Sequence, residues 1–137
     1  MFDAIATEHG IIYGYGLVSA HSNPAANQLV SDAMREHRER REEAIARLAA
    51  RNVTVPLPAA GYQVPVDVED PIAAAKLALQ MEEDASRAWR AVLEQATSGD
   101  DRAFAVTALS ESAVTAARWR TRLGVEPTTV AFPGGSE

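Results

Sequence analysis

The sequence contains no cysteine, and this absence excludes several kinds of chemistry at once. Disulfide bonds, zinc fingers, iron–sulfur clusters and thiol catalysis all require cysteine sulfur. Long apolar runs are absent too, since none approaches the roughly 20 residues that a membrane-spanning helix needs. The N-terminus also lacks the basic region and apolar segment of a secretion signal. We therefore expect a cytoplasmic protein with no membrane partner.

Positive charge and aromatic side chains are both scarce. Thirteen Lys and Arg residues stand against nineteen Asp and Glu, which gives a net charge of −6. A general nucleic-acid-binding protein normally has a basic face, so we expect no nucleic-acid partner. Aromatic residues make up only 6% of the chain, whereas hydrophobic residues, many of them alanine, make up 47%. This alanine-rich composition favours closely packed helices, and 137 residues suffice for one domain with a real core.

Four segments have the pattern of helices, and the polar residues at their ends support this interpretation. The predicted helices span residues 2–20, 24–50, 70–97 and 102–123. Residues suited to helix caps are Asn23, Asp70, Ser98 and Gly124. Gly10 and Gly14 lie four residues apart on the first helix, so we expect their shared face to admit a neighbouring helix closely.

The connections between these helices predict the topology. Two short turns flank a long proline-containing connection, residues 52–69. Fully extended, these residues can reach roughly 60 Å, enough to cross from one end of a helical bundle to the other. Two helical hairpins joined by such a crossover are typical of ferritin-like bundles. We expect one all-α domain, a four-helix bundle over residues 1–124, and a C-terminal tail over 125–137 that is partly disordered.

One charged or polar residue on each helix has a position that suggests a shared layer in the core. Glu8 and Glu82 both interrupt apolar stripes of their helices. Glu8 precedes His37 by 29 residues, and Glu82 precedes Glu111 by the same number. If the two hairpins have similar turns, all four side chains converge at one height. Three carboxylates and an imidazole suit iron, manganese or zinc.

The chain also resembles a known superfamily. Its topology and the stretch Glu-His-Gly-Ile-Ile-Tyr-Gly-Tyr-Gly at residues 8–16 are similar to those of ferritin-like proteins. With Arg-Glu-His-Arg-Glu-Arg-Arg at 35–41, Glu-Glu-Asp at 82–84 and Ala-Arg-Trp-Arg at 117–120, residues 2–123 resemble an uncharacterised, alanine-rich ferritin-like domain family of actinobacteria. The resemblance implies a fold and, at most, a metal site.

The di-iron pattern is incomplete in this sequence. Di-iron members carry one Glu on the first and third helices and Glu-x-x-His on the second and fourth. Glu8 and Glu82 match the single carboxylates, but Met34 stands where the motif that ends at His37 needs Glu. Val114 likewise stands where the motif that begins at Glu111 needs His. A complete di-iron site is therefore not expected, although a reduced carboxylate and histidine site is one alternative.

The second alternative is a buried ion-pair layer in which arginine takes the place of the metal. Its candidate members are the four polar residues together with Arg40, Arg41 and Arg118. Guanidinium groups form bidentate pairs with carboxylates, and such pairs are the commoner fate of buried charges. We expect a non-catalytic binding or assembly module, a homodimer without cofactor, whose di-metal site is degenerate. Two alternatives remain open: a metal-dependent oxidoreductase that uses the reduced site, and a small-molecule binder with a pocket near Tyr15, Trp89 and Trp119.

Overall fold

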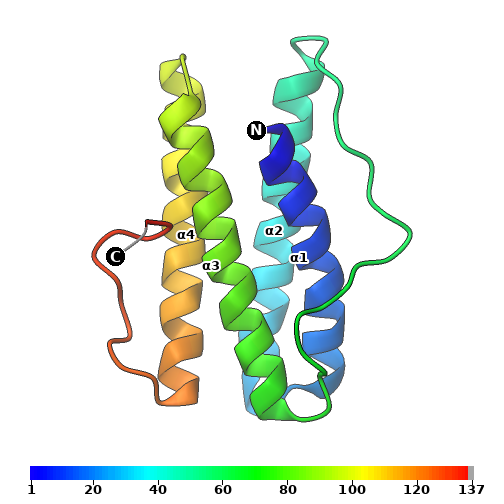
Figure 1. The fold of residues 1–137 in the computed structure, drawn as a ribbon, viewed down its shortest axis with the longest axis vertical. Helices are drawn as coiled ribbons and strands as arrows, with labels where there is room; N and C mark the ends of the chain where they lie inside the picture. The colour runs from blue at the N-terminus through cyan, green and yellow to red at the C-terminus, as the bar shows by residue number, and fades with distance from the viewer. Residues whose placement is uncertain (136–137) are drawn as a thin grey trace.

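The computed structural model describes residues 1–135, which form an all-helical structure without a β-strand (Figure 1). The four long helices are α1 (Phe2–His21), α2 (Asn27–Ala49), α3 (Pro71–Gln95) and α4 (Gly99–Leu123). A short 3₁₀ helix, η1 (Pro24–Ala26), precedes α2. Within the described residues, no helix is both long and apolar enough to cross a membrane.

The helices begin and end where capping side chains satisfy the free backbone groups. Asn23 accepts a hydrogen bond from the amide of Ala25, and Asp70 accepts one from Ala73. Ser98 accepts one from the amide of Asp101, so α4 begins at Gly99, earlier than the predicted residue 102. At the other end of α4, Gly124 adopts a φ of 65°, a left-handed conformation that costs glycine little.

The helices lie side by side along the long axis of the molecule (Figure 1). The closely packed pairs are α1 with α2, α1 with α3, and α3 with α4. Residues 50–70 run along the α1 side from one end of the molecule to the other, and residues 125–135 fold back beside α4 (Figure 1). Residues 136 and 137, the end of the tail predicted to be partly disordered, lie outside the described residues.

The two glycines of α1 that share a face have different neighbours. A Cβ atom on Gly14 would overlap the sulfur of Met81, so the Met81 side chain of α3 fills the space over this glycine. Gly10 instead faces the ring of Tyr62, at 3.5 Å. Of the two glycines predicted to face a neighbouring helix, Gly14 therefore does so and Gly10 does not, because residues 50–70 lie over Gly10.

The core is built from small side chains around a few large ones. Its buried alanines come from every helix, and its largest fully buried residues include Trp89, Trp119 and Tyr15. Three charged or ionisable side chains, Glu8, His37 and Glu82, are at most 1% exposed among them. Burial of such groups is costly unless each has a partner, so their partners determine what this core can do.

Candidate functional site

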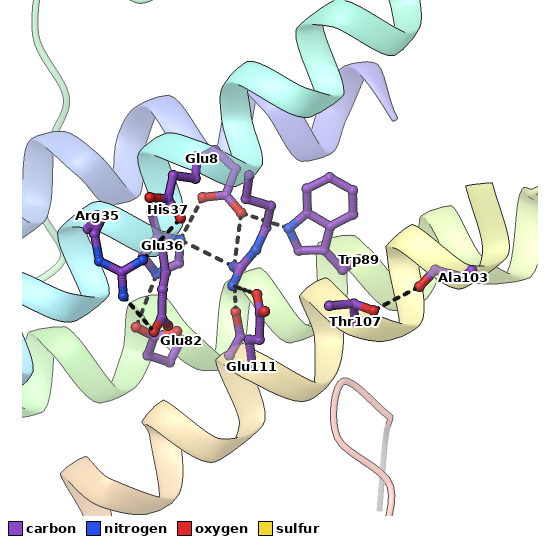
Figure 2. A network of polar contacts seen from close by, with 12 residues as sticks. Glu8, Arg35, Glu36, His37, Glu82, Trp89, Ala103, Thr107 and Glu111 are labelled. Carbon is purple, nitrogen blue, oxygen red and sulfur yellow. Dashed lines mark hydrogen bonds and ion pairs between the residues drawn. The ribbon is translucent and has the colours of Figure 1, made fainter. Parts of the chain in front are cut away.

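Side chains from all four helices meet in the middle of the molecule (Figure 2). Glu8 from α1, His37 and Arg40 from α2, and Glu82 from α3 are all buried. Glu111 of α4 lies at the edge, with 46% of its side chain exposed. Their positions follow from helical geometry, because Glu8 and Glu82 each interrupt an otherwise apolar face. We call Glu8, His37, Arg40 and Glu82 the core charge network.

His37 lies between the two buried carboxylates. Its Nδ1 atom is 2.6 Å from Oε2 of Glu8, and its Nε2 atom is 3.1 Å from Oε1 of Glu82. Burial opposes a charge on His37, but the negative charges and hydrogen bonds of Glu8 and Glu82 outweigh this effect and raise its pKa to about 9. His37 is therefore an imidazolium at neutral pH and donates from both ring nitrogens.

Arg40 supplies the second buried cation and connects three helices. Its Nη1 atom donates to Oε1 of Glu8 at 3.3 Å and to Oγ of Ser112 at 2.8 Å. Its Nη2 atom donates to Oε2 of Glu111 at 3.0 Å. Burial opposes ionisation of Glu8, but His37 and then Arg40 outweigh it, so the pKa of Glu8 lies below its ordinary value. Arg40 thus stands between the carboxylates of α1 and α4.

Aromatic side chains complete the hydrogen bonding of the two carboxylates. The indole of Trp89 donates to Oε1 of Glu8 at 2.7 Å, and the hydroxyl of Tyr15 donates to Oε1 of Glu82 at 2.5 Å. The indole of Trp119 in turn donates to the Tyr15 oxygen at 3.1 Å. Burial, and then the nearby charge of Glu82, raises the pKa of Tyr15 well above its ordinary value. Tyr15 is therefore a neutral donor.

The buried charges of this network balance. Glu8 and Glu82 are the two anions, and His37 and Arg40 are the two cations. The partly exposed Glu111 adds a further anion beside Arg40. Two buried atoms of the network, Oε2 of Glu82 and Nε of Arg40, have no hydrogen-bond partner. The network is thus internally neutral but not fully hydrogen-bonded.

The sequence-predicted residues take part in the site to different degrees. Glu8, His37 and Glu82 lie in direct contact, while Glu111 is connected to them only through Arg40. Arg41, expected beside the network, instead forms an ion pair with Glu42 at 2.7 Å and is partly exposed. Arg118, the other arginine expected there, is exposed on α4. Within residues 1–135, neither forms a hydrogen bond or ion pair with a member of the core charge network.

The donor set does not fit a metal ion. Both nitrogens of His37 are engaged with carboxylates, and a guanidinium stands where an ion would bridge Glu8 and Glu111. Val114 stands where the di-iron motif needs a histidine, but it is 52% exposed. A histidine at this position would therefore not face the core. In residues 1–135, no three or more His, Asp or Glu side chains are arranged to hold a metal. The arrangement supports fixed charges and proton sharing.

Sequence reasoning missed three participants of the network. The sequence placed Tyr15 and Trp89 only beside a ligand pocket and gave no indication of Ser112, yet each of the three hydrogen-bonds a charged member. A signal was present for two of them. Tyr15 follows Glu8 by seven residues, and Trp89 follows Glu82 by seven, so each lies two helical turns beyond a carboxylate. Because α1 and α3 run antiparallel, these equal spacings bring Trp89 of α3 beside Glu8 of α1, and Tyr15 of α1 beside Glu82 of α3.

Comparisons with known proteins place the chain among uncharacterised relatives. A family model described as a domain of unknown function (DUF4439) matches residues 1–137. The chain is also similar to the crystal structure of a conserved hypothetical protein, rv2844, from Mycobacterium tuberculosis, with 56% sequence identity and a TM-score of 0.87. That match covers 88% of this chain and 92% of the other. A search of curated proteins finds no match.

Proposed function

We propose that this chain, which belongs to the family described as a domain of unknown function (DUF4439), is a non-catalytic assembly module with a degenerate ferritin-like site. In this proposal the four helices form a ferritin-like four-helix bundle whose metal is replaced by fixed charges. The topology of two helix pairs separated by the long connection 50–70 supports the bundle.

The single observation that carries the proposal is the position of Arg40. Its guanidinium donates to Glu8 on α1 and to Glu111 and Ser112 on α4. A cation at this place does the electrostatic work of a metal ion, since it neutralises carboxylates that the core would otherwise leave uncompensated. Unlike a metal, it provides no open coordination position for a substrate and changes no oxidation state.

The role of such a network is to specify one arrangement of the helices. A buried ion-pair layer adds little net stability compared with apolar packing, but removal of one partner leaves an uncompensated buried charge. His37 connects Glu8 of α1 to Glu82 of α3, and Arg40 connects α1 to α4. We infer that the network fixes the register of the helices and so presents a defined outer surface for assembly.

Thermal unfolding with added metal tests this function. A ligand that binds only the folded state stabilises it by RT ln(1 + L/Kd), where L is the free ligand concentration, so the unfolding temperature rises with the logarithm of that concentration above the Kd. We expect no rise with iron(II), manganese(II) or zinc(II) in protein first treated with chelator and then freed of it. A rise that grows with the logarithm of the concentration of one of these ions and is lost in Glu82→Gln would replace the fixed-charge account with a metal site.

A further inference from the structure

A long groove runs along the outside of the molecule between α2 and α4. Three consecutive cavities of about 400, 270 and 500 Å³ mark it. All their lining residues belong to α2 or α4. These two helices are not among the closely packed pairs. The groove therefore exists because the helices are held apart.

Arginine side chains bridge the groove in place of apolar packing. Arg40 reaches Glu111 near its middle. At one end, Arg51 reaches Asp101 at 2.6 Å, while the guanidinium of Arg47 lies 4.6 Å from the ring centre of Phe104. Long polar bridges keep two helices in register without filling the space between them. The seam between α2 and α4 therefore stays open although side chains connect the two helices.

The irregular segments of the chain cover other faces. Residues 50–70 place Tyr62 against Gly10 and Tyr13 of α1. The tail places Gly134 against the backbone of Ser86, where it covers the seam between α3 and α4. Neither segment contributes a lining residue to the three cavities between α2 and α4. The α2–α4 groove is the seam that the described residues leave uncovered.

The surface of α4 beside this groove includes an exposed apolar side chain. Val114, which lines the middle cavity, is 52% exposed. Between Ala103 and Ser110 the helix carries no charged side chain. An apolar helix face beside an open seam is the kind of surface that a second helix covers.

The cavity at the Phe104 end of the groove is acidic, and the cavity at the other end is basic. Four carboxylates line the acidic cavity (Glu36, Glu39, Glu43 and Glu111), against Arg35, the buried Arg40 and the neighbouring Arg47, which pairs with Glu43. The other end carries Arg118 and Arg122 against Asp32. Arg118 forms no ion pair with any side chain of residues 1–135, and Oε1 of Glu111 is not used by Arg40. A surface that is acidic at one end and basic at the other complements itself after a half-turn.

We propose that the α2–α4 groove is the interface of a homodimer in which α4 packs antiparallel against α4 of a second copy. The two-fold axis passes close to Val114, midway between Glu111 and Arg118. Each Arg118 then meets Glu111 of the other copy, and the two Val114 side chains bury each other. This proposal rests on the assembly role above and names its partner as a second copy of the chain.

Single cysteines test the register, because the natural chain has none. In Val114→Cys the two thiols lie next to the axis, so mild oxidation should give a disulfide-linked dimer in high yield. Thr107→Cys is the matched control, because Thr107 is also exposed on α4 and lines the same groove. Its thiols would lie roughly 21 Å apart at a rise of about 1.5 Å per residue, too far to bond. Equal linkage of both variants, or linkage of Thr107→Cys alone, would overturn the register.

Charge reversal tests the ion pairs by a second route. Sedimentation of the natural protein should give twice the chain mass of 14.7 kDa. We expect Arg118→Glu to raise the dimer dissociation constant at least about tenfold, because two attractions become two repulsions. Arg38→Glu is the control, since Arg38 is exposed on α2 and lines none of the three cavities. A monomeric natural protein, or equal weakening by both variants, would overturn the interface.

These outcomes are separate from those of the metal test. A metal-free monomer would overturn the homodimer and leave the fixed-charge core standing. A metal-loaded protein that is linked at residue 114 would overturn the fixed-charge core and leave the homodimer standing. A partner protein that binds at Val114 in competition with self-association would replace the second copy as the occupant.

Discussion

The Nδ1 atom of His37 lies 2.6 Å from Oε2 of Glu8 in a region that solvent does not reach. The contact joins α2 to α1 and, together with the contact to Glu82, raises the pKa of the imidazole to about 9, so that it is charged at neutral pH. His37 therefore acts as a structural cation, and its titration becomes a property of the whole fold.

The stability of the protein should fall as the pH rises from about 6.5 to above 9. His37 binds its proton more tightly in the folded than in the unfolded chain, because its pKa rises from 6.5 to about 9 on folding. Its contribution is complete below the unfolded pKa and is lost as the pH passes the folded one, and it amounts to on the order of 3 kcal/mol. Urea unfolding followed by circular dichroism between pH 6 and 9.5 measures it.

His37→Gln is the control for this pH dependence, since glutamine cannot take up the charge. The variant should be less stable near pH 6 and should lose much of the decline above pH 6.5. Glu8 has the opposite sign: its depressed pKa stabilises the fold above about 4.5 and less as the pH falls below that value. If both proteins declined equally above pH 6.5, His37 would not be the titrating group.

Removal of the buried arginine should be far more damaging than removal of its neighbour. Arg40→Ala leaves Glu8 with one cation fewer and leaves the hydroxyl of Ser112 without its donor, so we expect a loss of about 3–5 kcal/mol. Arg41→Ala removes a partly exposed pair with Glu42 and should cost less than about 1 kcal/mol. Equal unfolding free energies for the two variants in urea would show that the network carries no such penalty.

Substitution of the two tyrosines of α1 should likewise lower the stability of the protein by different amounts. Tyr15→Phe removes the donor to Glu82 and the acceptor for the indole of Trp119, which remains buried. An unsatisfied buried group costs roughly 1–3 kcal/mol, so the unfolding temperature should drop by several degrees. Tyr13→Phe alters a side chain that is 45% exposed and should change the temperature little. Calorimetry that gave the same small shift for both would contradict the hydrogen-bond chain.

Two alanine substitutions in α1 separate helix propensity from packing. Gly16 has open space where a Cβ would stand, so Gly16→Ala should stabilise the helix by about 0.5–1 kcal/mol. At Gly14 the same methyl group would overlap the sulfur of Met81, and Met81 must move within a packed core. We therefore expect Gly14→Ala to destabilise the protein in chemical denaturation. A gain in stability at both positions would mean that Met81 does not pack against Gly14 as described.

The sequence predicted the core layer better than its chemistry. The equal 29-residue spacings predicted that residues of four helices lie at one height, and the interrupted apolar stripes identified Glu8 and Glu82. Periodicity gives the face of a helix but not the rotation of its neighbour, so it did not separate Arg40 from Arg41. The sequence likewise did not show that Glu111 lies at the exposed edge of the layer, because its exposure depends on the open seam between α2 and α4.

The hydrogen-bond partners depend on contacts between helices, which a single sequence does not record. Trp89 has an apolar ring system and one polar nitrogen. Only the position of Glu8 across the core shows that this nitrogen donates a hydrogen bond to a buried carboxylate. The same holds for Gly10, whose neighbour is Tyr62 from the long connection and not a helix. Helix ends were easier to predict, because caps such as Asp70 are local in the chain.

The metal content of protein purified without chelator tests the central claim most directly. The claim is that Arg40 and His37 supply the positive charge that the buried carboxylates need. Elemental analysis after expression in medium supplemented with iron, manganese and zinc should find far less than one ion of any of these metals per chain. One or two ions per chain, lost in Glu8→Gln and Glu82→Gln, would contradict it.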